Sequence, residues 1–174
     1  RVRWAAGAAA VAFIALVVFL AFGRGSSTPP SPLLGKAAPP LSAHLVGTSK
    51  TVSLSDYAGK WVLVNFGAEW CTDCRIEMPQ LKAFAASEAK HNAVLLTVDE
   101  DGTDVGNMAA YMRSQHADWP LLYSAQAPVT WGVGTIPDTF IVSPQGTVVA
   151  RLLSGVNAKA VDQAIAKAAG PGGA

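Results

Sequence analysis

The 174-residue chain has an apolar fraction of 51% and a formal net charge of +1, with 13 Lys and Arg against 12 Asp and Glu. This length and this apolar fraction suffice for one domain with a hydrophobic core. The balanced charge includes no long run of either sign, which excludes the electrostatic footprint expected of a protein that binds nucleic acid or an anionic surface.

The first predicted element is an apolar helix over residues 4–22, a segment without a charged residue. About 20 apolar residues in a helix cross the hydrocarbon core of a membrane. Arg1 and Arg3 precede the segment and only Arg24 follows it closely, which places the N-terminus in the cytoplasm by the positive-inside rule. We therefore expect residues 1–24 to be a transmembrane anchor or an uncleaved signal in the cell membrane, with the folded part extracytoplasmic; a cleaved signal peptide is the alternative.

A flexible linker is predicted next, because Ser and Pro dominate residues 25–34. Two short strands over 41–46 and 51–54 flank Gly47, and residues 55–60 are predicted to turn. The folded part is therefore expected to begin with β-structure.

A buried strand followed by a helix is predicted around the two cysteines. Residues 61–66 form a nearly continuous apolar run, which is typical of a strand buried on both faces. Helical spacing begins at Cys74 and ends near Lys90, and Pro79 predicts a kink inside this helix. The residues expected on its buried face are Ile76, Met78, Leu81, Phe84 and Ala85.

A second strand and helix follow, over residues 93–98 and 105–116. The inward residues expected on this helix are Met108, Tyr111 and Met112. The spacing thus predicts a repeat of the strand–helix alternation.

The C-terminal part is predicted to be a hairpin and a helix. Strands over 139–142 and 147–153 are joined by a Ser-Pro-Gln-Gly turn, and a helix over 158–169 precedes a disordered tail at 170–174. The order of elements predicts an α/β fold with a mixed central β-sheet flanked by helices.

The two cysteines of the chain, Cys71 and Cys74, are three positions apart at the predicted start of a helix. The free N–H groups and the positive dipole end of a helix N-terminus favour a thiolate at Cys71, whereas Cys74 lies one turn further in. Because a thiolate is the attacking species in disulfide exchange, Cys71 is predicted to attack and Cys74 to resolve the mixed disulfide.

Two other interpretations of this pair remain open. One is a purely structural disulfide, although so short a loop constrains few unfolded conformations. The other is a copper site with both thiolates and one histidine, although His44, His91 and His116 lie in different segments and two thiolates are too few for a closed zinc site. The preferred interpretation involves no metal and no cofactor.

Three stretches of the chain match a known family: LVNFGAEWCTDCRIEMPQL, GKAAPPLSAHLVGTSKTVSLSDYAGKWVLVNF and WGVGTIPDTFIVSPQGTVVARLLSG. They resemble the TlpA/ResA/CcmG (DsbE) family of membrane-anchored, thioredoxin-like thiol-disulfide oxidoreductases. The resemblance implies a thioredoxin-like fold over residues 35–169 with an N-terminal β-hairpin extension, and a redox disulfide between Cys71 and Cys74.

The resemblance also implies that Pro137 is a cis-proline beside the sulfurs. A cis bond there would expose the backbone of Ile136 to an extended substrate segment. A Pro137 that merely begins the following strand is the alternative.

An acid is implied next to the cysteines as well. Glu77 matches an acid of the family and would accept the proton of Cys74, one helical turn away. Ordinary thioredoxin has an Asp where this chain has Asn65, which cannot take a proton. A solvated Glu77 paired with Arg75 or Lys82 is the alternative.

Side chains around the cysteines are expected to shape the site. Thr72 and Asp73 separate the two thiols, and a carboxylate such as that of Asp73 or Glu69 disfavours a nearby thiolate, which favours a reductant over a strong oxidant. Trp70 is expected to cover the disulfide and to form part of a docking surface, with a core position as the alternative.

The function expected from these features is that of a membrane-tethered extracytoplasmic thiol-disulfide oxidoreductase. It would reduce cysteine-containing client proteins, with apocytochrome c implied by the resemblance, and would receive electrons from a donor in the membrane. The alternatives are a copper-delivery module and a thiol peroxidase; the peroxidase would need a Thr-x-x-Cys site, which the sequence lacks.

Overall fold

The computed structural model describes residues 31–87, 92–100, 102, 105–153 and 155–170. The predicted anchor at 1–24 and most of the predicted linker and tail lie outside these residues. Within the described ranges, no helix combines the length and the apolar sequence that a membrane crossing requires.

A mixed sheet forms the centre of the described part of the chain. Two parallel pairs, β3 with β4 and β4 with β5, are flanked by antiparallel strands on both sides, in the order β2-β1-β5-β4-β3-β6-β7. The strands are β1 (Ser42–Leu45), β2 (Thr51–Ser53), β3 (Trp61–Gly67), β4 (Ala93–Asp99), β5 (Leu121–Tyr123), β6 (Asp138–Val142) and β7 (Val148–Leu153). The predicted mixed sheet and the N-terminal hairpin of β1 and β2 are thus present.

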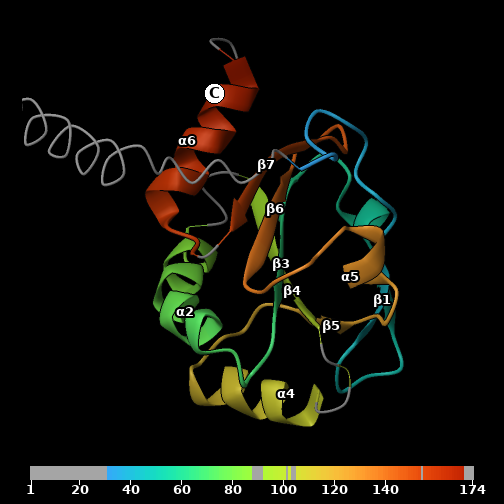
Figure 1. Cartoon of the computed structure of the whole chain (residues 1–174), viewed down its shortest axis with the longest axis vertical. Helices are drawn as coiled ribbons and strands as arrows, with labels where there is room; N and C mark the ends of the chain where they lie inside the picture. Colours follow the sequence, from blue (N-terminus) through green and yellow to red (C-terminus); the bar gives the residue numbers. More distant parts are fainter. Residues whose placement is uncertain (1–30, 88–91, 101, 103–104, 154, 171–174) are drawn as a thin grey trace, which may run out of the picture. The chain divides into compact units, whose positions relative to one another are not determined.

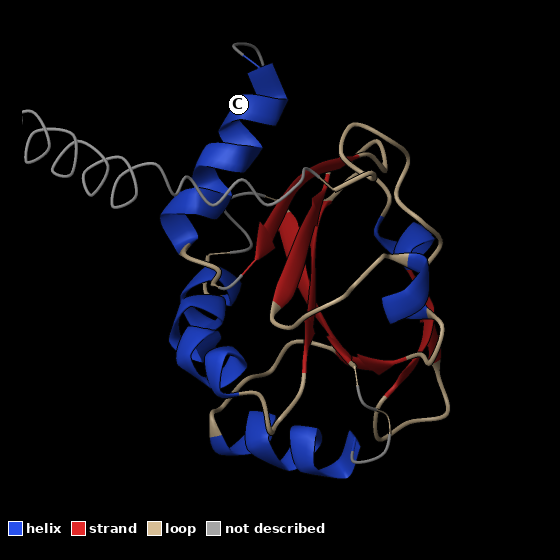
Figure 2. Ribbon diagram, viewed as in Figure 1, coloured by secondary structure: helices blue, strands red, loops and turns tan. Residues whose placement is uncertain are grey.

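Helices cover both faces of this sheet (Figures 1 and 2). They are η1 (Leu54–Tyr57), α2 (Thr72–Ala85), α4 (Val105–Ser114), α5 (Ala127–Thr130) and α6 (Ala158–Ala169). Alternate side chains of β3 point to opposite faces of the sheet. Leu63 packs in the hydrophobic cluster that includes residues of α2, α4 and α6, whereas Val64 and Phe66 pack in the cluster that includes a residue of α5. The run at 61–66 is therefore buried on both sides, as its composition predicts.

Several local predictions differ from the structure. The turn predicted at 55–60 begins as the 3-10 helix η1, whose Ser53 N–H donates to Asp56 Oδ2 at 2.8 Å. The helix expected to reach Lys90 ends at Ala85. Residues 31–34, assigned to the linker, form a turn in which the Leu34 N–H donates to the Ser31 carbonyl, and Ser31 is buried.

The buried face of α2 also differs from the prediction. Ile76 is 69% exposed, whereas Glu77 is 4% exposed. The buried stripe runs through Cys74, Glu77, Met78, Leu81 and Phe84, at intervals of three and four residues. Ile76 falls outside that stripe, so the prediction that placed it in the core is wrong.

Two elements were missed. β5 and α5 are three and four residues long and lie between the predicted helix at 105–116 and the predicted strand at 139–142. β5 completes the sheet by pairing with β4 on one side and β1 on the other.

Candidate active site

The disulfide lies at the N-terminus of α2. Cys71 is the N-cap residue of this helix, and its Sγ accepts a hydrogen bond from the Cys74 N–H at 3.1 Å. A disulfide joins Cys71 to Cys74, with their Cα atoms 5.2 Å apart, and each residue is 6% exposed. After reduction, the same N–H donor and the positive end of the helix dipole would favour a thiolate at Cys71.

The loop before β6 closes one side of the disulfide. Ile136 packs against the small cluster of Ala68, Cys71 and Cys74. The peptide bond between Ile136 and Pro137 is cis, and Pro137 is buried directly before the first residue of β6. Segments far apart in sequence, the start of α2 and the loop before β6, thus meet at the sulfurs.

Glu77 is a buried acid on the same side of α2 as Cys74. Its Oε1 accepts a hydrogen bond from Asn65 Nδ2 at 2.9 Å, and its Oε2 accepts one from the Val156 N–H at 3.0 Å. Burial raises the pKa of Glu77, and the hydrogen bonds from Val156 and Asn65 oppose that increase. The alternative of a solvated carboxylate is therefore wrong, and Arg75 pairs with Glu69 instead.

A chain of buried polar groups holds Asn65 in place below the disulfide. Asn65 Nδ2 also donates to Thr139 Oγ1 at 2.9 Å, so the amide group serves two acceptors. The hydroxyl of Thr97 faces Asn65 Oδ1 at 3.5 Å and receives a hydrogen bond from Trp119 Nε1 at 2.9 Å. In this arrangement the Asn65 amide presents its N–H group to Glu77 and its oxygen to Thr97.

Gly67, at the end of β3, has no side chain and leaves space between Cys74 Sγ and the side chain of Asn65. A Cβ at Gly67 would lie 3.5 Å from Cys74 Sγ and 3.8 Å from Asn65 Oδ1. The inner sulfur and the Asn65 amide therefore border the same small space.

The rim of the site is exposed. Trp70 is 59% exposed, which excludes a core position, and Thr72 and Asp73 are also exposed. Arg75 Nη1 lies 2.8 Å from Glu69 Oε1, and its guanidinium lies 4.9 Å from the ring centre of Tyr111. Burial raises the pKa of Tyr111, and the charge of Arg75 opposes this. The Glu69 carboxylate is thus partly neutralised by Arg75.

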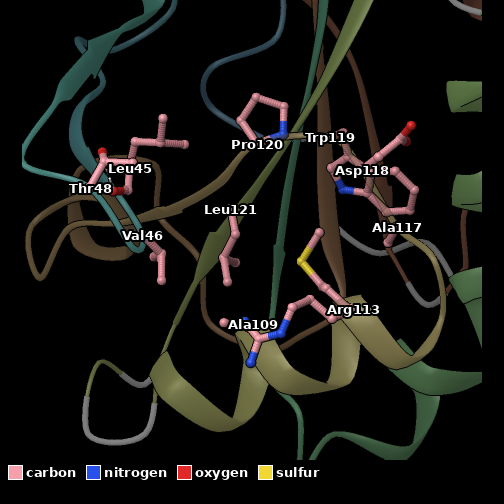
Figure 3. Close-up of a pocket in the computed structure, with 11 residues that line it drawn as sticks. Leu45, Val46, Thr48, Ala109, Arg113, Ala117, Asp118, Trp119, Pro120 and Leu121 are labelled. Atoms are coloured by element: carbon pink, nitrogen blue, oxygen red, sulfur yellow. Dashed lines mark hydrogen bonds between the residues drawn. The ribbon is translucent and has the colours of Figure 1, made fainter.

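A separate pocket of about 360 Å³ lies between the end of β1, α4 and the segment that leads into β5 (Figure 3). Arg113 of α4 and Asp118 lie at this pocket, and Trp119 joins it to the polar chain through Thr97. The pocket therefore borders the series of buried polar groups at Trp119, the end opposite to Glu77.

Among the residues that the structure describes, no three His, Cys, Asp or Glu side chains gather in a way that could hold a metal ion. His44 lies in β1 and His116 follows α4, while His91 is outside the described residues. Neither of the two described histidines therefore joins the cysteines in a metal-binding group.

Sequence reasoning missed two partners of the site. Val156 and Thr139 contact Glu77 and Asn65 from positions 79 and 74 residues away in the chain. A backbone N–H has no sequence signal of its own, so only the fold could reveal the role of Val156.

The profile of the AhpC/TSA family matches residues 34–151. The chain belongs to the AhpC/TSA family. Among curated relatives, the thiol-disulfide oxidoreductase ResA of Oceanobacillus iheyensis is 28% identical over 120 residues, which cover 66% of this chain and 62% of that relative. ResA of Bacillus subtilis is 32% identical over 108 residues, 58% of this chain and 56% of that relative. The chain thus spans less than two thirds of the length of these two relatives.

Solved structures agree with this family. A thiol:disulfide interchange protein of Chlorobium tepidum, assigned as DsbE, superposes with a TM-score of 0.69 at 26% identity, over 79% of this chain and 98% of that one. The thioredoxin domain of a thiol-disulfide oxidoreductase from Bacteroides vulgatus gives a TM-score of 0.65 at 25% identity, over 76% and 98%. The described domain therefore has the thioredoxin-like fold of thiol-disulfide oxidoreductases of the ResA and DsbE type, with the Cys71–Cys74 disulfide at the N-terminus of α2.

Proposed function

We propose that the whole protein is a membrane-tethered, extracytoplasmic oxidoreductase that reduces disulfides in client proteins. The observation that carries this proposal is the Cys71–Cys74 disulfide at the N-terminus of α2, with the buried carboxyl group of Glu77 three residues after Cys74 on the same helix. A structural disulfide needs neither a helix N-terminus nor a buried acid, whereas thiol exchange uses both.

The reaction begins with the reduced pair. The Cys71 thiolate attacks one sulfur of a client disulfide, that S–S bond breaks, and the client's other sulfur leaves as a thiolate. Cys74 then gives its proton to Glu77 and attacks Cys71 Sγ, which releases the second client thiolate. Two electrons have moved from the protein to the client, and the protein is left with the disulfide that the structure contains.

The surrounding charges support the reducing direction. Asp73 is exposed in the first turn of α2, where its negative charge disfavours a thiolate at Cys71. A less stable thiolate makes the reduced form a better electron donor. The ion pair with Arg75 weakens the corresponding contribution of Glu69.

Tethering and client choice rest on the sequence. The uncharged segment 4–22 and the arginines before it support a single-pass anchor with the domain outside the cytoplasm. An electron donor in the same membrane would then restore the thiols. The resemblance to the TlpA/ResA/CcmG family makes the cysteines of apocytochrome c the client that we propose.

Reduction of insulin disulfides tests the activity. The wild type is expected to accelerate reduction by dithiothreitol, and Cys74→Ala is expected to accumulate a mixed disulfide through Cys71 that mass spectrometry detects. Cys71→Ala is the matched control and should trap nothing. If Cys74→Ala traps no client while the reduced wild type binds Cu(I) tightly, the copper-delivery alternative replaces this proposal.

A further inference from the structure

One guanidinium bonds both ends of the loop that borders the disulfide. Arg151 lies in β7, and its Nε and Nη2 donate to Asp138 Oδ1 and Oδ2 at 2.9 and 2.6 Å. Arg151 Nη2 also donates to the carbonyl of Gly132 at 3.2 Å. Gly132 and Asp138 flank the loop 133–137, so a single side chain closes that loop like a clasp.

The clasp is itself held rigidly. Asp138 is fully buried at the start of β6, and the side chain of Arg151 is 15% exposed. The guanidinium lies 5.1 Å from the ring centre of Phe140, one of the fully buried side chains of the core. A planar fork with two carboxylate bonds has one preferred orientation, which in turn fixes the donor that faces Gly132.

The pKa values of Asp138 and Arg151 depend on each other. Burial raises the pKa of Asp138, and the hydrogen bonds and charge of Arg151 oppose that increase. Asp138 in turn raises the pKa of Arg151. The hydrogen bonds and the charge of Arg151 thus favour the charged form of Asp138, and the loop end at β6 is tied to β7 through this pair.

The loop leads directly to the sulfurs. Ile136 lies within it and packs against Cys71 and Cys74. A small disulfide needs only to reach Cys71, whereas a polypeptide must also lie along the residues that border the disulfide. The position of the loop therefore matters for polypeptide clients and hardly at all for small disulfides.

We propose that Arg151 and Asp138 are positioning residues that hold the loop 133–137 in place for docking of polypeptide disulfides. This inference rests on the proposed oxidoreductase function and adds which residues select polypeptide clients over small ones. Neither side chain takes part in electron or proton transfer.

Arg151→Lys tests the clasp in the full chain. Lysine keeps the charge beside Asp138 but lacks the planar fork, so it cannot bond the carboxylate twice and reach Gly132 as well. The matched control is Arg113→Lys, the same exchange on the exposed surface of α4 (Figure 3). Two substrates are compared, a peptide with an intramolecular disulfide and Ellman's reagent, with thermal unfolding measured alongside.

For Arg151→Lys the KM for the peptide is expected to rise about five- to tenfold, which is about 1 to 1.4 kcal/mol of docking free energy and less than the full loss of one charge-assisted hydrogen bond. The kcat and the rate constant with Ellman's reagent should stay within about twofold of the wild type. Asp138→Asn, which keeps an acceptor but loses the charge, should change KM in the same direction by a smaller factor. Arg113→Lys should leave all of these values unchanged.

Two results would overturn the inference. One is an unchanged KM for the peptide in both variants. The other is an equal loss with peptide and Ellman's reagent, which would show a general effect on the fold. If the wild type itself fails to reduce the peptide, the proposed function fails and not only the role of the clasp.

Discussion

Asn65→Asp would place a second carboxyl group against Glu77 in the buried network. Asn65 Nδ2 now donates to Glu77 Oε1 at 2.9 Å, so the substitution sets two carboxyl oxygens about that far apart. Both residues are buried, with 2% and 4% of their surface exposed. The pair is therefore expected to keep one proton that Glu77 alone would release.

The size of the effect follows from this distance. Two negative charges about 3 to 4 Å apart repel by about 4 to 6 kcal/mol at an effective dielectric constant of about 20. That energy raises the pKa at which the pair loses its last proton by about 3 to 4. A raised folded-state pKa stabilises the fold at low pH, and this stability is lost as pH rises. Relative to the wild type, the variant should lose about 1.4 kcal/mol of unfolding free energy per pH unit across that interval.

Urea unfolding between about pH 5 and pH 8 measures this difference. Asn157→Asp is the matched control, because Asn157 is exposed and its side chain caps α6 by accepting from the Ala160 N–H, which Asp does equally well. A free energy of unfolding for Asn65→Asp that runs parallel to the wild-type value over this range would refute the reasoning.

Three further predictions concern the buried acid Glu77, the core residue Phe140 and the helix cap Asn157. Burial raises the pKa of Glu77, so the rate of insulin reduction by the wild type should rise as this carboxyl group ionises, at a pH above the usual range of a glutamic acid. Glu77→Gln should lose this rise in the pH–rate profile. An unchanged profile would contradict the role of Glu77 as proton acceptor. Phe140→Ala removes a fully buried ring and should cost about 3 to 5 kcal/mol in urea unfolding, whereas Val129→Ala, at an 82% exposed position, should stay within about 0.5 kcal/mol. Asn157→Ala removes the cap of α6 and should cost about 1 kcal/mol in the same assay.

The strands and helices with strong sequence patterns were predictable. The apolar runs at 61–66 and 93–98 predict β3 and β4, and the helical spacing between them predicts α2. Both signals are local, because they depend only on the order of apolar and polar residues within one segment. β5 was not predictable, since three residues hold too little pattern and its place depends on pairing with β4 and β1.

The site shows the same division. Cys71 and Cys74 and their position at a helix N-terminus were predictable from spacing. The burial of Glu77 in place of Ile76 was not, because a buried carboxyl group is tolerated only where donors reach it, and here those donors are Asn65 and Val156 from other segments. The clasp between Asp138 and Arg151 likewise joins two strands, and the sequence around neither residue predicts the contact.

The hydrogen bond from Val156 to Glu77 has a consequence for biosynthesis. Both cysteines leave the ribosome well before β7 and the segment that contains Val156. A nascent chain that has emerged only as far as β4 has Cys71, Cys74 and Glu77, yet its acid lacks one of the two donors that hold it in the finished protein. Glu77 is therefore held by both of its donors only after one of the last described segments of the chain has been made.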